Sequence, residues 1–283
     1  MNPALDQMLA EADAAISRSS ATADGPLRVG VDLGTATIVL FALDVDGSPL
    51  VGAQREAEVV RDGVVVDFAG AVEVVIALRA DLEARLGREL TAAATTYPPG
   101  VALPEVRATS YVLEAAGLEC EAMVDEPTAA NRVLGITDGA VVDVGGGTTG
   151  IARIAEGEVV GTADEPTGGR HVSLVIAGAY GIDFDEAEAR KVDPAWQPLL
   201  LGVVRPVFEK VGTIVASHVA GTGVESIHLV GGTSAFAGIA EVVADVTGLP
   251  TCVPGNPLYV TPLGVALHHV ETLTSPGEAR EHG

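Results

Sequence analysis

A short glycine-rich pattern occurs twice in the chain, and this repeat restricts the possible folds more than any other feature. VDLGT at residues 31–35 follows a β-branched stretch, and VDVGGGTT at residues 142–149 follows another. In both copies an apolar stretch continues after the loop, at residues 38–43 and 150–154. A strand, a sharp glycine loop and a second strand, present twice, predict two related halves that face each other.

The two loops have the composition of phosphate-binding turns. Glycine lets backbone N–H groups approach phosphate oxygens because it has no Cβ atom in the way. Asp32 and Asp143, one in each copy, can hold Mg²⁺ through its water ligands, because this hard cation gives up water reluctantly. The simpler interpretation is a pair of tight hairpins without a ligand, but the presence of two such loops favours a clamp around a polyphosphate.

A third element places a carboxylate at a strand end. The apolar strand that ends at Val124 meets a helix with Pro127 in its first turn. Glu126 therefore lies at the sheet edge where α/β proteins usually bind ligands. There it could orient and deprotonate a water that attacks a terminal phosphate. Alternatively, it only stabilises the dipole of its own helix.

Two further segments carry weaker signals. Residues 229–234 are typical of a strand that ends in a Gly-Gly turn before a helix at residues 239–247. This turn could pass close to a nucleoside. Residues 187–191, AEARK, have the composition of a solvated helix face.

The remaining pattern alternates strands and helices, as expected of an α/β fold. We expect further strands at residues 28–31 and 64–68, and helices at residues 71–86, 104–116 and 205–220. The predicted units are a first half at residues 27–138, a second half at residues 139–262, and a C-terminal helix that packs back on the first half, followed by a tail, at residues 263–283.

Residues 1–26 form a separate unit in this prediction. Leu5, Met8, Leu9 and Ile16 share one face of an amphipathic helix at residues 4–16. The Ser, Thr, Ala, Asp and Gly residues that follow, up to Pro26, have the composition of a flexible linker. The helix could dock on a partner through its apolar face, fold back onto its own domain, or fray.

Charge and motif content exclude several functions. Sixteen Lys and Arg against 39 Asp and Glu give a net charge of −23, which would repel nucleic acid and anionic membranes. Apolar runs are too short to cross a bilayer and the N-terminus is acidic, so we expect a cytoplasmic protein. Cys120 and Cys252 predict buried thiols in a reducing compartment. The chain has no GxxxxGK[ST], HExxH or GxSxG motif, and its histidines lack ligand spacing.

Four of the segments described above lie at residues 31–35, 125–130, 142–149 and 229–234. In this order they resemble the phosphate-one, connecting, phosphate-two and adenosine motifs of the actin, DnaK-chaperone and sugar-kinase superfamily. The resemblance covers roughly residues 28–272. Residues 59–68, VVRDGVVVDF, are similar to a segment of the bacterial MreB and FtsA branch. The resemblance to the ethanolamine utilization protein EutJ family is closer, on VDLGT, VVRDGVVVDFAGAV, AATTYPPG, VDEPTA, VVDVGGGTTGIA, ADEPTGG and a late TPL. It implies an α/β, actin-like ATPase fold of duplicated ribonuclease H-like domains, with the adenine-side subdomain lost.

The resemblance also implies roles for single residues. Asp32 and Asp143 would be the carboxylates on the Mg²⁺ side, and Glu126 would be the base that activates water. The implied phosphate-loop and nucleoside contacts are Gly34, Thr35, Gly145, Gly146, Gly147, Thr148, Glu188, Lys191, Gly231, Gly232 and Thr233.

The chain departs from the superfamily at three places. Gly150 stands where the DnaK group has a further Asp, and a phosphate-contacting Lys of the first half has no counterpart. Both changes should slow hydrolysis, because each removes charge that organises Mg²⁺ or the transition state. Only residues 192–204 separate Lys191 from the helix predicted at residues 205–220. Actin-like relatives usually insert a subdomain there that covers the adenine, so we expect weaker binding and faster exchange.

By this resemblance the protein is an ATP- and Mg²⁺-binding, chaperone-like accessory protein of ethanolamine utilization and at most a slow ATPase. It would assist assembly, protection or reactivation of ethanolamine ammonia-lyase, or bind other cargo or shell proteins of a bacterial microcompartment, whose lumen it would enter through the N-terminal helix. A nucleotide-dependent or pseudo-ATPase scaffold of the MreB, FtsA or pilus-assembly type is the alternative. A small-molecule kinase fits less well, because no catalytic Asp beside a sugar pocket can be located.

Overall fold

The computed structural model describes residues 3–61, 64–99 and 103–269. Three predicted features lie wholly or partly outside these ranges: Asp62 and Gly63 of the VVRDG segment, Gly100 of the YPPG segment, and the tail from residue 270 onward. In the described ranges, none of the helices combines the length and apolar composition needed to cross a bilayer.

Two five-stranded sheets repeat one topology. The strand orders are β3-β2-β1-β6-β7 and β10-β9-β8-β11-β12, with three antiparallel strands followed by parallel ones in each sheet. The first sheet comprises β1 (Arg28–Leu33), β2 (Thr37–Leu43), β3 (Pro49–Glu56), β6 (Ala92–Tyr97) and β7 (Glu119–Asp125). The second comprises β8 (Gly139–Val144), β9 (Thr149–Ala155), β10 (Glu158–Glu165), β11 (Ile227–Val230) and β12 (Thr251–Cys252). The predicted duplication is therefore present, and each glycine loop joins the first two strands of its sheet.

Helices cover each sheet and complete its core. The first half has α2 (Phe68–Leu86) and α3 (Leu103–Ala115), and a short β4–β5 pair (Val60–Arg61 and Val64–Val65) precedes α2. The second half has α5 (Gly169–Tyr180), α6 (Phe184–Val192), α7 (Gln197–Val219), α8 (Ile239–Thr247) and two 3₁₀ turns, η1 (Gly232–Ala235) and η2 (Pro257–Tyr259). The expected strand at residues 64–68 is shorter than predicted, because the Asp67 side chain accepts a hydrogen bond from the Gly70 N–H and starts α2 at Phe68.

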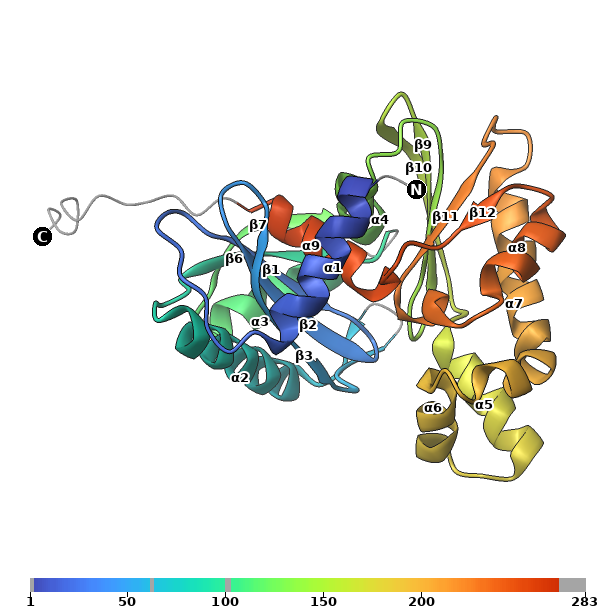
Figure 1. Ribbon diagram of the computed structural model, residues 1–283, viewed down its shortest axis with the longest axis horizontal. Coiled ribbons are helices and arrows are strands. Elements are labelled where there is room, and N and C mark those ends of the chain that lie inside the picture. Colours follow the sequence, from blue (N-terminus) through green and yellow to red (C-terminus); the bar gives the residue numbers. More distant parts are fainter. Residues whose placement is uncertain (1–2, 62–63, 100–102, 270–283) are drawn as a thin grey trace, which may run out of the picture.

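Two helices cross between the sheets and join the halves (Figure 1). These are α4 (Glu126–Leu134), which packs against β8 and β9, and α9 (Val260–Leu267), which packs against β1, β2 and β6. They approach so closely that a Cβ atom added to Gly264 would lie 1.9 Å from the carbonyl oxygen of Ala129. The last helix that the structure describes therefore belongs to the core of the first half.

The N-terminal helix, α1 (Pro3–Ser17), lies along β3. Leu9, Ala12 and Ala15 on its apolar face are 0–1% exposed, so this face is covered by the chain's own sheet. Of the three alternatives for the helix, the structure shows the one in which it folds back onto its own domain.

The prediction of a flexible linker after this helix is wrong. The Arg85 side chain donates hydrogen bonds to the carbonyls of Ala15 and Arg18, and Arg88 donates one to the carbonyl of Gly25 at 2.7 Å. Arg18 in turn donates to the carbonyl of Pro49 at 2.9 Å. These contacts hold residues 18–26 on the first half, and the composition of the segment carried no sign of arginines more than 60 positions later.

The helix predicted at residues 205–220 begins earlier. α7 starts at Gln197 and contains Pro206, so residues 193–196 alone separate it from α6. The predicted start, placed just before the proline, is wrong because a helix this well buried tolerates an internal proline. The connection where the resemblance implies a lost subdomain is thus shorter still.

Candidate functional site

The two glycine loops meet at the interface of the halves. The loop between β1 and β2 contains Gly34 and Thr35, and the loop between β8 and β9 is closed by a hydrogen bond from the Gly145 N–H to the Thr148 carbonyl. A Cβ atom added to Gly146 would lie 2.9 Å from the Cβ atom of Ala36, so the loops are in contact across the interface. Thr35 and Gly147 line one cavity of about 320 Å³. This arrangement brings the predicted phosphate-loop residues of both halves together.

Three predicted carboxylates lie behind these loops. Asp32 is on β1, Asp143 is on β8, and Glu126 is the first residue of α4. Each aspartate is fixed by a threonine that the sequence did not single out. The Thr96 hydroxyl donates to Asp32 Oδ1 at 2.7 Å, and the Thr261 hydroxyl donates to Asp143 Oδ2 at 2.7 Å.

Burial and mutual repulsion shift the acidity of this group. Burial raises the pKa of Asp32 to about 7, Thr96 opposes the shift, and the charge of Asp143 adds to it. The pKa of Asp143 is raised by burial, against the hydrogen bond from Thr261. The pKa of Glu126 lies well above its ordinary value, first because of burial and then because of Asp143, Asp32 and Asp164. Each carboxylate is therefore costly to ionise unless positive charge is nearby.

A hydrated divalent cation fits this set better than a bare one. In the ranges that the structure describes, no three His, Cys, Asp or Glu side chains converge closely enough to ligate a metal directly. Carboxylates that face each other across a larger space can instead bind the water shell that Mg²⁺ retains. Asp32 and Asp143 are positioned for this role, one from each half.

Asp164 is a site residue that sequence reasoning missed. It lies on β10 opposite Gly150 of β9, and a Cβ atom added to Gly150 would be 3.8 Å from its Oδ1 atom. Its charge also contributes to the raised pKa of Glu126. The turn at Glu156-Gly157 could not have found it, because the pairing of β9 with β10 shifts register between Val159 and Gly161, and counting from the turn alone would place Ala163 opposite Gly150.

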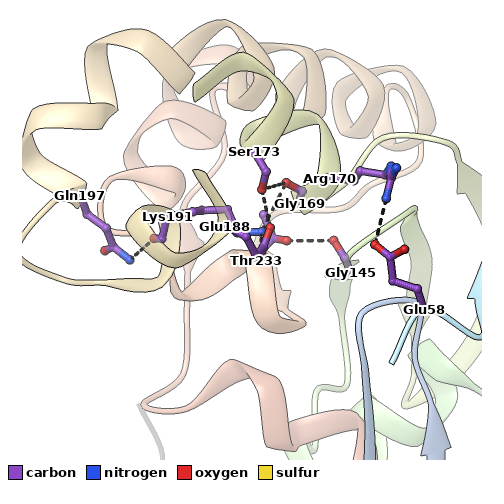
Figure 2. A network of polar contacts seen from close by, with 9 residues as sticks. All are labelled: Glu58, Gly145, Gly169, Arg170, Ser173, Glu188, Lys191, Gln197 and Thr233. Carbon is purple, nitrogen blue, oxygen red and sulfur yellow. Dashed lines mark hydrogen bonds and ion pairs between the residues drawn. The ribbon is translucent and has the colours of Figure 1, made fainter. Parts of the chain in front are cut away.

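The predicted nucleoside-side residues form one polar network beside the second loop (Figure 2). Thr233 Oγ1 donates to the Gly145 carbonyl at 2.8 Å. Lys191 Nζ forms an ion pair with Glu188 Oε1 at 2.6 Å and donates to the Gly169 carbonyl at 3.4 Å. The Lys191 side chain is only 12% exposed. The expectation of a solvated helix face at residues 187–191 is therefore wrong for these two side chains, because α6 turns them toward α5 and the loop.

The adenosine-motif turn packs directly on the second loop. Gly231 has φ 85°, and a Cβ atom there would lie 2.2 Å from Asp143 Oδ1, so only glycine fits. Gly232 opens the 3₁₀ turn that carries Thr233. Gln197 supports this region in a way the sequence did not indicate: its side chain donates to the Lys191 carbonyl at 3.1 Å and accepts from the Ala237 N–H at 2.9 Å.

The sequence matches one family model, and it matches several known relatives over most of their length. A family model described as type IV pilus assembly protein PilM matches residues 102–259. Ethanolamine utilization protein EutJ of Escherichia coli is 41% identical over 251 residues, which are 88% of each chain. EutJ of Salmonella typhimurium is 41% identical over 263 residues, 93% of this chain and 92% of the relative. The chain belongs to the EutJ family. It also belongs to the family that the PilM model describes, since the match covers more than half of its residues.

Solved structures agree with the EutJ assignment. The crystal structure of EutJ from Carboxydothermus hydrogenoformans aligns with a TM-score of 0.88 and 47% identity, covering 93% of this chain and 98% of that one. The PilM–PilN type IV pilus biogenesis complex aligns at 0.70 with 15% identity (85% and 97% covered), and MreB5 of Spiroplasma citri bound to AMPPNP at 0.66 with 18% identity (84% and 94% covered). These last two show the fold alone. The predicted family and the actin-like fold are confirmed, whereas the loss of an adenine-side subdomain stays a prediction.

Proposed function

We propose that this EutJ-family protein is a chaperone-like accessory protein of ethanolamine utilization that binds Mg²⁺ and ATP between its halves. The observation that carries the proposal is the contact between the two glycine loops at Ala36 and Gly146, with carboxylates from both halves behind them. Backbone N–H groups from both sides of such an interface can surround one polyphosphate. The family relationship supports the ethanolamine part of the proposal.

The residues divide into three roles. Asp32 and Asp143 accept hydrogen bonds from the waters of Mg²⁺, and the loops hold the phosphates. Glu126 orients the attacking water. When bound, Mg²⁺ neutralises phosphate charge and lowers the pKa of the carboxylates around it. Gly150 stands in place of a further Asp, and the first half lacks a phosphate-contacting Lys, so charge that would organise Mg²⁺ or the transition state is missing and turnover is slow at best.

A clamp that closes on a nucleotide can act on a protein client. The halves are joined through α4 and α9, so a change of nucleotide state alters the angle between them. We propose ethanolamine ammonia-lyase as the client, another cargo or shell protein of the microcompartment as the alternative client, and the microcompartment lumen as the place of action. The net charge of −23 disfavours nucleic acid and anionic lipid as ligands.

Isothermal titration with Mg·ATP, Mg·ADP and a non-hydrolysable analogue tests the nucleotide part. We expect saturable binding by the native protein and loss of binding in Asp143→Ala. Asp245→Ala is the matched control, because Asp245 is exposed and pairs with Arg205 on α7, away from the loops. The absence of binding at millimolar nucleotide would contradict the proposal.

The client part needs a separate measurement. Purified ethanolamine ammonia-lyase and the EutJ-family protein should co-elute in gel filtration in one nucleotide state and separate in the other. Reactivation of inactivated lyase should require both the protein and nucleotide. Co-elution that ignores the nucleotide would argue against a clamp that loads and releases this client.

The alternative is a nucleotide-dependent or pseudo-ATPase scaffold of the MreB, FtsA or pilus-assembly type. The match to the PilM model favours it. Sedimentation with and without ATP distinguishes the two: a scaffold that polymerises would pellet with nucleotide, whereas a clamp would stay in the supernatant.

A further inference from the structure

The cavity between the halves has a cationic wall. It is lined on the first half by Thr35, Glu58 and Arg61, and on the second half by Gly147, Arg170 and His171. The whole chain has 16 Lys and Arg against 39 Asp and Glu. Two arginines beside both phosphate loops are therefore unusual in so acidic a chain. Their positive charges favour the binding of an anion in this cavity.

Arg170 is anchored to the second loop. Its backbone N–H donates to the Gly146 carbonyl at 2.8 Å, and it follows Gly169, whose N–H donates to the Gly145 carbonyl at 2.9 Å. Its guanidinium carbon lies 4.9 Å from the centre of the Phe184 ring, in a cation–π contact. The base of this side chain is therefore fixed beside the glycines that face the first loop.

The tip of the same side chain reaches across to the other half. Arg170 Nη1 forms an ion pair with Glu58 Oε1 at 3.3 Å, as Figure 2 shows. The two side chains are 51% and 73% exposed, so water screens their charges and the ion pair is weak. A phosphate has more charge than a carboxylate and accepts bidentate hydrogen bonds from arginine, so it can displace Glu58.

We propose that Arg170 exchanges Glu58 for the terminal phosphate of a nucleoside triphosphate. This inference rests on the proposed nucleotide-binding function. With a diphosphate bound, the terminal phosphate is missing and Arg170 keeps its contact with Glu58 on the first half. With a triphosphate bound, Arg170 turns into the cavity and the contact between the halves is released. The nucleotide state is thereby converted into the presence or absence of one bridge between the halves.

Titration of variants with Mg·ATP and Mg·ADP tests this exchange. In Arg170→Gln we expect the Kd for Mg·ATP to rise about tenfold, because a charge-assisted pair to phosphate is lost, with the Kd for Mg·ADP within about twofold of the native value. Glu58→Gln should lower the Kd for Mg·ATP a few-fold and leave Mg·ADP unchanged, because the competing carboxylate is removed. Arg205→Gln is the control, since it removes an equal charge from an exposed ion pair on α7.

The outcomes separate this inference from the function on which it rests. If the native protein binds neither nucleotide, the proposed function and the exchange at Arg170 are both contradicted. If the native protein binds both nucleotides and Arg170→Gln weakens them equally or not at all, the exchange alone is overturned. Thermal unfolding of each variant shows whether it is folded, and Glu58→Gln gives an independent answer if Arg170→Gln is not.

Discussion

At the scale of single residues, the centre of the molecule concentrates negative charge that it does not neutralise by itself. Asp32, Glu126 and Asp143 come from three different strand ends; burial raises the pKa of each, and the charge of Asp143 raises the pKa of Asp32 and Glu126 further. Two threonine hydroxyls compensate only in part. The site therefore gains stability from protons or from a bound cation, and both effects can be measured.

The first prediction concerns pH. The pKa of Asp32 is about 7 in the folded protein and 3.8 as an ordinary carboxyl, so between these values the folded state binds a proton that the unfolded state has lost. The free energy of unfolding should then decrease as pH rises from about 4 to 7, by about 1.4 kcal/mol for each unit of pKa shift at most. Asp32→Asn should remove much of this dependence and raise the melting temperature at pH 8.

Thermal melts of both proteins from pH 4.5 to 8, without divalent cations, make the measurement. Asp245→Asn, on the exposed surface of α8, serves as the control and should keep the native slope. A melting temperature that rises toward pH 8 in the native protein would contradict the prediction.

The second prediction concerns Asp164. We expect Asp164→Ala to weaken Mg²⁺-dependent nucleotide binding about tenfold, as losses around a metal's outer shell often do. Adding Gly150→Asp should recover part of the loss, because position 150 faces Asp164 and has room for a Cβ atom. Glu165→Ala is the neighbouring control, since this side chain contacts His218 instead. Equal binding by Asp164→Ala and the native protein would show that this carboxylate has no part in the site.

The residues of the site could be predicted from the sequence where the signal is local. Gly145 and Asp143 lie within a few positions of each other, and the loop chemistry is visible in that stretch. Asp164 and Thr261 reach the same place through strand register and helix packing, over 21 and 118 positions from Asp143. Without the fold, nothing distinguishes them from other polar residues.

At the scale of elements, α1 is part of the first half. Its buried face contacts β3, and the segment after it is held by Arg18, Arg85 and Arg88. Sequence periodicity predicted the helix and its apolar face correctly. What it could not supply was the surface that covers this face, because β3, Arg85 and Arg88 lie more than 30 positions further along the chain.

The third prediction follows for this helix. Leu9→Ala should lower the free energy of unfolding by about 2–4 kcal/mol, because a fully buried leucine leaves a cavity. Gln7→Ala, on the exposed side of the same helix, should change it by less than about 0.5 kcal/mol. Denaturant titration gives both values. If Leu9→Ala were as stable as Gln7→Ala, the helix would not be a structural part of the domain in solution.

At the scale of the whole molecule, two sheets of equal topology are held by the crossing of α4 and α9. Both helices begin in the site, α4 with Glu126 and α9 beside Thr261. A change of charge between the loops therefore changes the electrostatic potential at the start of both helices. The duplication was visible in the sequence as a repeated loop. The crossing of the two helices depends instead on one close approach at Gly264, which no sequence pattern indicates.

The fourth prediction addresses that crossing. Gly264→Ala places a Cβ atom against the Ala129 carbonyl and should destabilise the protein by about 3 kcal/mol, because α4 and α9 must separate. Gly202→Ala in α7 is the matched control, since a Cβ atom there meets nothing within 4 Å; it should stabilise by about 0.5–1 kcal/mol. Calorimetry of both variants measures these changes in stability. A Gly264→Ala variant as stable as the native protein would contradict the close crossing of α4 and α9.

The packing of α9 on β1 also bears on how the protein is made. A Cβ atom on Gly30 would lie 2.4 Å from the Ala266 backbone nitrogen, and the Val29 N–H donates to His269 Nδ1 at 2.9 Å. The earliest strand thus receives its cover from the last described helix. Ribosomes add about 5–20 residues each second, so for many seconds the emerging first sheet exposes an apolar surface. A protein that we propose as a helper for other chains thus leaves part of its own first sheet uncovered until α9 has left the ribosome.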